Sequence, residues 1–220
     1  TEIEDRLVTR TLKALITANN SFIPTFIGTR ASTADPSVKN EGRSSWDTDM
    51  FTKSGSPFFI GGVVNFSAYM ANNGFAACDI AIIHLGSNDA YRITKEAYEA
   101  NLKTLITSLW AYNPNMEVIL SMPTLGSVKT SDGNYIKTIT VPFIEQAKTG
   151  FVSYSSPNSV PVTLCPSYMA VNRARDWGYV FPTEQRDGQP FVYDSMHLNS
   201  TGYTRIADMM FSAIMYALNN

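Results

Sequence analysis

One continuous apolar segment, residues 79–85 (DIAIIHL), constrains the fold of this chain more than any other feature. It is rich in β-branched residues and does not alternate with polar ones, which is typical of a strand buried on both faces of a parallel sheet. The runs Val118–Met122 and Val160–Leu164 predict two further buried strands, which are stopped by Pro123 and Pro166. The run Phe22–Ile27, closed by a glycine, predicts a fourth strand.

Helix-like patterns separate these strands. Apolar residues recur at near-helical spacing from residue 2 to residue 18, after acidic residues that suit a first helical turn. Further helices are predicted at 66–73, 94–112, 136–150 and 199–219. Pro142 should kink or restart the third of these, because proline lacks the backbone N–H that a helix interior uses.

Alternating strands and helices predict an α/β domain with a doubly wound parallel sheet and helices on both faces. In such sheets ligands gather at the carboxyl ends of the strands. Residues 29–57 form a long loop rich in Gly, Ser, Asp and Pro, and loops of that length inside a domain are usually functional. The polar segments 126–136 and 172–190 are either lids or simple loops.

Bulk properties limit the classes of function. The 220 residues suffice for one domain over 1–220, and the formal charge of 17 − 19 = −2 gives no basic surface for nucleic acid. No apolar run is long enough for a membrane span, and no His, Cys or carboxylate spacing indicates a metal site or a cofactor. Cys78 and Cys165 form no disulfide framework. The preference for Asn, Ser and Thr slightly favours an extracellular or virion-associated protein, but the sequence leaves the compartment unknown.

The segment Tyr193-Asp194-Ser195-Met196-His197 carries the strongest chemical signal. A histidine near neutral pKa can take a proton from a serine hydroxyl, and a carboxylate can orient the ring and stabilise its cation. Asp194 and His197, three residues apart, supply both groups on one turn. The other histidine, His84, lies near the end of a buried strand and is expected to be a core residue.

Gly86-Ser87-Asn88-Asp89 follows the first buried strand directly. The sequence is good turn chemistry in itself, but its position favours Asn88 as a side-chain donor to a developing oxyanion. Asp89 is expected to brace the loop. Further upstream, residues 41–46 (EGRSSW) place Gly42 in the long loop, where its backbone N–H is a second candidate donor.

With these motifs in this order, the chain resembles the SGNH or GDSL-type serine esterases over roughly residues 20 to 215. The resemblance implies a flavodoxin-like, three-layer sheet and ester hydrolysis without a cofactor. It also implies Gly42 and Asn88 as the oxyanion hole, with Asp194 and His197 as two members of the catalytic triad. Acyl groups on carbohydrates, lipids or other small esters are the substrates of the family.

The family's first motif, Gly-Asp-Ser after the first strand, is missing from this chain. The resemblance implies that the missing strand lies between Phe22–Ile27 and residues 79–85, and that the nucleophile lies upstream of Thr1 on a removed or separate segment. Ser44, Ser45 and Ser87 are weaker candidates because none follows a strand-to-helix elbow. Thr1 as an N-terminal nucleophile fits no other feature.

Two functions remain open from the sequence. The first is an esterase that acts on an acylated carbohydrate or small ester, with Arg43, Trp46, Ser87 and Tyr193 as possible substrate-binding residues. Trp46, Trp177 and Tyr179 favour a sugar ester, since aromatic rings stack on sugar faces. The second is a catalytically inactive, carbohydrate-binding or structural module of a larger secreted or phage-tail assembly.

Overall fold

A parallel sheet of three strands forms the centre of the protein. The computed structural model describes residues 7–19, 23–127, 131–177, 185–186, 189–190 and 197–219. The strands β5 (Ile80–Ile83), β6 (Glu117–Ser121) and β7 (Val162–Cys165) pair in the order β5-β6-β7. All three lie within two residues of their predicted bounds, and both pairings are parallel, as predicted.

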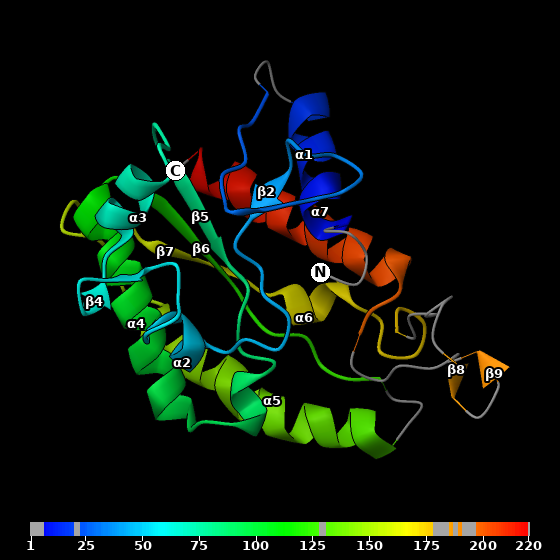
Figure 1. The fold of residues 1–220 in the computed structure, drawn as a ribbon. Coiled ribbons are helices and arrows are strands. Elements are labelled where there is room, and N and C mark those ends of the chain that lie inside the picture. The colour runs from blue at the N-terminus through cyan, green and yellow to red at the C-terminus, as the bar shows by residue number, and fades with distance from the viewer. Residues whose placement is uncertain are drawn as a thin grey trace.

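Helices cover both faces of this sheet (Figure 1). One face packs against α3 (Phe66–Asn72), α4 (Lys95–Tyr112) and α5 (Ser131–Phe151) around a core that includes Leu102, Leu120 and Phe143. The other face packs against α1 (Leu7–Asn19), α6 (Ser167–Ala170) and α7 (Ser200–Ala217), and its core includes Leu12, Ile119 and Ile206. The predicted three-layer α/β architecture is therefore confirmed.

Helices α4 and α7 begin where polar side chains satisfy one of their first N–H groups. Thr94 caps α4 by accepting a hydrogen bond from the backbone N–H of Ala97 at 3.2 Å. Asn199 caps α7 in the same way through the N–H of Gly202, at 3.1 Å. None of the helices in the described ranges is long and apolar enough to cross a membrane.

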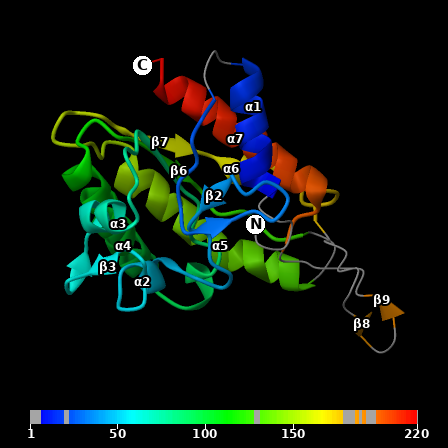
Figure 2. The same ribbon diagram turned by 45° about the horizontal axis from the view of Figure 1, so that its top comes forward.

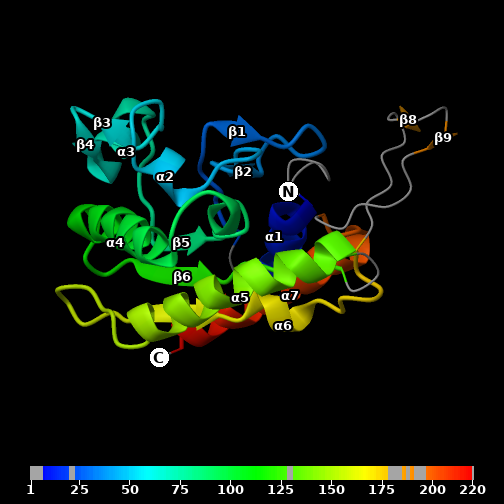
Figure 3. The same cartoon turned by 90° about the horizontal axis from the view of Figure 1, so that it is seen from below.

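The long loop predicted over residues 29–57 contains short elements of its own. The two-residue strands β1 (Arg30–Ala31) and β2 (Lys39–Asn40) pair antiparallel, and α2 (Thr48–Phe51) follows them. A second antiparallel pair, β3 (Phe59–Ile60) and β4 (Val63–Val64), leads into α3 and lies beside α4 (Figures 2 and 3). Within the predicted loop 172–190, β8 (Gln185–Arg186) pairs with β9 (Gln189–Pro190).

The predicted strand Phe22–Ile27 is wrong for the residues that the structure describes. Residues 23–28 carry no strand, because no described neighbour pairs with their backbone. Their side chains nevertheless alternate as in a strand of the sheet: Phe26 packs into the core on the α1 and α7 side, and Ile27 into the core on the α4 side. The apolar pattern correctly predicted the alternating burial of these side chains, but no described strand pairs with their backbone.

Helix α5 begins five residues before its predicted start, so the segment 126–136 is only partly a loop. Pro142 lies inside this helix without ending it, because Phe143, Ile144 and Ala147 on the same stretch are buried in the core. The short 3-10 helix η1 (Asp89–Tyr91) follows β5 and contacts both α4 and α5.

Gly202, in the first turn of α7, gives the first test of this packing. A Cβ added at Gly202 would lie 2.5 Å from the backbone oxygen of Asp176 and 3.0 Å from the Cβ of Leu198. Gly202→Ala should therefore destabilise the fold by about 1–3 kcal/mol. Thermal unfolding should show a fall of about 2–4 °C per kcal/mol. The exposed neighbour Ser200→Ala is the matched control; equal melting temperatures for the two variants would contradict the close approach.

Candidate active site

The candidate site residues that the structure describes lie in segments that meet at the carboxyl edge of the sheet. Residues 84–91 follow β5, residues 122–127 follow β6, and residues 166–177 follow β7. Parallel strands end at one edge, so these segments are brought together by the fold. The segment that carries His197 joins them, because the backbone N–H of Asn199 donates to the Asp176 carbonyl at 2.9 Å.

Asn88 connects two of the sequence motifs directly. Its Nδ2 donates a hydrogen bond to the backbone oxygen of Trp46 at 2.9 Å. The motif after β5 and the motif at residues 41–46 therefore lie side by side, although 42 positions separate the two residues. An asparagine amide has two N–H donors, and this contact uses one of them.

Asp89 braces this junction, as its sequence position indicated. Its Oδ1 accepts hydrogen bonds from the backbone N–H of Thr48, at 2.9 Å, and from the Thr48 hydroxyl. The carboxylate is fully buried, and its Oδ2 has no hydrogen-bond partner among the described residues. Burial raises the pKa of Asp89, and the hydrogen bonds from Thr48 only partly oppose that effect.

Gly42 lies on the same loop, and its N–H is engaged within the protein. It donates to Oδ1 of Asn40 at 2.8 Å, while Nδ2 of Asn40 reaches the Thr9 hydroxyl of α1 at 3.4 Å. Gly28 makes this arrangement possible: its φ is +151°, and a Cβ there would lie 2.3 Å from the Asn40 carbonyl oxygen. The glycine thus lets the chain pass against β2.

Glu41 organises the surroundings of Gly42. Its carboxylate accepts hydrogen bonds from the Thr29 N–H at 2.6 Å, the Tyr69 hydroxyl at 2.7 Å and Arg43 Nη2 at 3.0 Å. The Arg43 guanidinium also lies 4.9 Å from the ring centre of Trp46. Arg43 and Trp46 therefore make loop-anchoring contacts. The sequence showed Glu41 only as part of the motif, and its role as a shared acceptor was missed.

His197 is half-buried just before α7, and its neighbours are firmly placed. Leu198 is buried and forms a β-bridge with Trp177. Asn199 Nδ2 donates to the Arg175 carbonyl at 2.8 Å. Asp176 is buried in turn, and its Oδ2 accepts from the Asn172 N–H at 2.7 Å. The position of the histidine is therefore fixed by the turn that follows β7.

Three predicted residues lie outside the described ranges: Asp194, Tyr193 and Tyr179. The expected hydrogen bond between Asp194 and His197 stays a prediction. Trp177 lies within the described ranges and is buried, with 4% of its surface exposed, so it offers no face for stacking on a sugar. That part of the expectation was wrong because the β-bridge to Leu198 turns residue 177 into the core.

Arg173 is a positioning residue that the sequence did not reveal. Its Nε donates to the Gly126 carbonyl at 2.5 Å, and its Nη2 donates to the Gly133 carbonyl at 3.1 Å. One side chain thus joins the segment after β7 to the segment after β6 and to the start of α5. An arginine in a polar loop carries no local signal for this role, because its partners are backbone oxygens 40 or more positions away.

His84, which is partly buried, begins a polar chain that runs to two buried serines. Its Nδ1 lies 2.8 Å from the Ser121 hydroxyl, which lies 2.6 Å from the Ser167 hydroxyl. Burial lowers the pKa of His84 to about 4, so its ring is neutral near pH 7. The expectation that His84 is a core residue is met only in part, because its side chain remains partly exposed.

The three alternative serines do not occupy a nucleophile elbow. Ser44 and Ser45 are exposed in a turn, and Ser45 has a φ of +62°. Ser87 is exposed in the loop after β5. Across the residues that the structure describes, no group of three or more His, Cys, Asp or Glu side chains could hold a metal ion.

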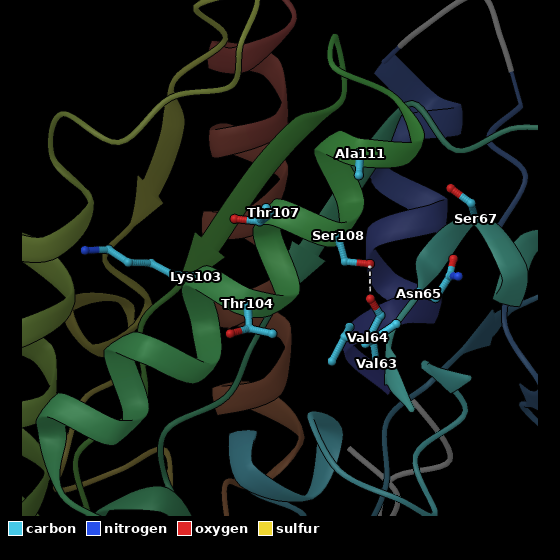
Figure 4. A pocket seen from close by; sticks show the side chains of 9 residues that line it. All are labelled: Val63, Val64, Asn65, Ser67, Lys103, Thr104, Thr107, Ser108 and Ala111. Atoms are coloured by element: carbon cyan, nitrogen blue, oxygen red, sulfur yellow. Dashed lines mark hydrogen bonds between the residues drawn. The ribbon is translucent and has the colours of Figure 1, made fainter. Parts of the chain in front are cut away.

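A groove of about 610 Å³ lies elsewhere, along the outer face of α4 (Figure 4). Its lining includes Val63, Val64, Lys103 and Ser108, and none of the candidate site residues. Ser108 already donates to the Val64 carbonyl, at 3.2 Å, and Lys103 pairs with Glu99. The polar groups of this groove thus serve the fold, and it is not the candidate active site.

Asp89→Asn tests the bracing of the Asn88 loop. The raised pKa means that the folded state holds the carboxyl proton more tightly than the unfolded state does, so the free energy of unfolding falls as pH rises above the ordinary value of 3.8. An asparagine keeps an acceptor for Thr48 and removes the buried charge. We expect the variant to be more stable than the parent at pH 8 by about 1–3 kcal/mol, and the gain to vanish near pH 4.

Urea denaturation at pH 4, 6 and 8 measures this difference. Asp49→Asn, a change at a partly exposed carboxylate that pairs with Lys53, is the control and should alter stability little at any pH. A gain for Asp89→Asn that does not depend on pH would rule out the buried charge as its source.

Comparison with solved structures identifies the fold. The chain is similar to a family 3 carbohydrate esterase of Talaromyces cellulolyticus, with a TM-score of 0.60 and 17% identity, over 97% of this chain and 92% of that one. A mutant acetyl esterase with an acetate ion matches with a TM-score of 0.58 and 17% identity, over 97% of this chain and 91% of that one. A family 3 carbohydrate esterase of Clostridium thermocellum matches with a TM-score of 0.57 and 16% identity, over 96% of this chain and 87% of that one.

A search of curated protein sequences found no match. The sequence profile of the GDSL-like lipases and acylhydrolases, which are ester-hydrolysing enzymes, matches residues 16–210. This match spans the Gly42 loop, the Asn88 loop and His197, which are the segments that the structure brings to the carboxyl edge of the sheet. The chain belongs to the GDSL-like lipase/acylhydrolase family.

Proposed function

We propose that this protein removes acetyl or other short acyl groups from a carbohydrate or a small ester, through a serine–histidine–aspartate triad. The observation that carries the proposal is the hydrogen bond from Asn88 Nδ2 to the Trp46 carbonyl. It joins the two loops with the predicted oxyanion donors at the edge of the sheet where His197 also lies. The similarity to carbohydrate esterases and an acetyl esterase supports the choice of substrate class.

Each residue has a defined step in this mechanism. A serine hydroxyl attacks the acyl carbonyl carbon while His197 takes its proton, and Asp194 orients the imidazole. The N–H of Gly42 and the second N–H of Asn88 Nδ2 stabilise the negative oxygen. His197 then protonates the departing alcohol, and water releases the acyl group by the reverse sequence of proton transfers. Substrate binding would displace Oδ1 of Asn40 from the Gly42 N–H.

We place the serine on a strand next to β5 that none of the described residues supplies. Within the described ranges β5 pairs on one side only, with β6, although its sequence is that of a strand buried on both faces. Phe26 and Ile27 pack into the cores on opposite faces of the sheet. A strand between them and β5 would satisfy the free edge of β5, and its carboxyl end would place a serine near Asn88.

A second function is an inactive module that binds carbohydrate, within a larger secreted or phage-tail assembly. One observation favours it: the N–H of Gly42 is held by the Asn40 side chain at 2.8 Å and is not presented to a ligand. The labelling experiment below separates the two functions, because it detects an activated serine directly.

A fluorophosphonate probe tests where the serine lies. The chain Thr1–Asn220 should not be labelled at Ser44, Ser45 or Ser87, and His197→Ala should not change its background hydrolysis of p-nitrophenyl acetate. The same chain joined to the segment that carries the proposed strand should be labelled on that segment. Labelling and turnover should fall by orders of magnitude in its His197→Ala variant, because nucleophile and base act as a unit.

Peptide mapping by mass spectrometry identifies the labelled residue. A label on Ser44, Ser45 or Ser87 that disappears in the His197→Ala variant would refute the external serine. If the extended chain carries no label anywhere and hydrolyses no ester, the inactive module is the correct function.

Asn88 should contribute to the rate and little to substrate binding. In the serine-bearing form, Asn88→Ala should lower kcat for acetyl esters by about 10²–10³-fold with a smaller change in KM, as for the loss of one oxyanion donor. Asn115→Ala, at an exposed asparagine in the turn between α4 and β6, is the control and should leave kcat unchanged. An equal loss for both variants, or a change in KM alone, would argue against the assignment.

A further inference from the structure

Two exposed tyrosines lie together at the carboxyl edge of the sheet. Tyr91 ends η1 and Tyr135 lies near the start of α5, and their ring centres are 6.4 Å apart with the planes tilted by 55°. Tyr91 is 42% exposed and Tyr135 is 60% exposed. Two aromatic rings from different elements thus form one solvent-facing surface, called here the tyrosine platform.

The platform is set apart from other exposed side chains by its location. The backbone N–H of Tyr91 donates to the Asn88 carbonyl at 3.2 Å, so the platform begins one turn after the proposed oxyanion donor. The remaining large aromatic side chain that is well exposed in the described ranges, Tyr216, lies on α7, and neither η1 nor the start of α5 carries it. Exposed apolar surface beside a site often marks a ligand contact.

The support of the platform is rigid. Arg173 holds the Gly133 carbonyl, two residues before Tyr135, and its Nη2 also reaches Oδ1 of Asn134 at 3.2 Å. On the other side, the Asp89 carboxylate fixes the start of η1 through Thr48. Rings on a fixed backbone lose little freedom on binding, which favours affinity.

We propose that the tyrosine platform binds the sugar rings that carry the acyl group, as a subsite for a neutral pyranose polymer. The inference rests on the proposed function, since it places the carbohydrate part of that substrate. The negative face of an aromatic ring attracts the C–H groups of a pyranose, and a phenol hydroxyl bonds to sugar hydroxyls. The exposed carboxylate of Asp132, close enough to Tyr91 to interact with it electrostatically, is a further acceptor for them.

Binding measured without turnover tests the platform, so the test does not need the serine. Calorimetric titration of the folded chain with soluble acetylated xylan should give an association constant that falls about five- to tenfold in both Tyr91→Ala and Tyr135→Ala. Tyr135→Phe should keep most of the affinity, because the ring face remains. Tyr216→Ala is the control: a tyrosine of similar exposure on α7, expected to bind as the parent does.

Each outcome decides the proposal. No binding of acetylated xylan by the parent chain, no loss in either alanine variant, or an equal loss in Tyr216→Ala would overturn it. Circular dichroism and unchanged melting temperatures show that the variants are folded. If an alanine variant is not folded, Tyr91→Phe and Tyr135→Phe are compared with the parent in its place. A more than fivefold fall of the association constant in either phenylalanine variant would overturn the stacking role. Failure of the proposed function looks different: the platform binds xylan, yet the serine-bearing form hydrolyses no ester.

Discussion

Hydrogen bonds from both edges of β6 hold β5 and β7 parallel to it, and every candidate residue depends on this pairing. Ile119 at the centre of β6 lies opposite Ile82 on one side and Thr163 on the other. Because the three strands run the same way, the chain leaves each of them at the same edge. Segments that are far apart in the sequence therefore meet there, and the loop with Asn88, the side chain of Arg173 and the turn before α7 share one region.

Two buried carboxylates and one partly buried carboxylate give that region its shape. Glu41 and Asp176 accept hydrogen bonds from the backbone N–H groups of loop residues, at 2.6 and 2.7 Å, and Asp89 accepts one from the first residue of α2, at 2.9 Å. A charged acceptor makes a shorter and stronger hydrogen bond than a neutral one does. The loops are thus fixed mostly by side chains within the protein before any substrate arrives, which is the arrangement that electrostatic stabilisation of a transition state requires.

Local patterns predicted the strands and helices because the side chains that an element buries recur in the sequence at the spacing of that element. They failed where a partner far along the chain decides the outcome. Residues 23–28 carry the alternation of a strand but lack a described partner for their backbone. The start of α5 contains Gly133, which is a poor helix former, yet this part of the chain is helical. Gly133 packs closely against Ser127, because a Cβ added at Gly133 would lie 2.0 Å from the Ser127 backbone oxygen. The bond from Thr48 to Asp89 spans 41 positions and leaves no local trace.

The burial of Asp89 and Asp176 has a consequence for the behaviour of the protein in salt. Mobile ions screen charges that water can reach, over a Debye length of about 10 Å at 0.1 M, and screen buried pairs much less. Surface pairs such as Lys148 with Glu145 should therefore weaken in concentrated salt, while the Asp89 and Asp176 contacts keep their strength. The shape of the candidate site should consequently depend little on ionic strength. Concentrated salt that weakens ion pairs on the outer helices should leave the loops around Asn88 unchanged.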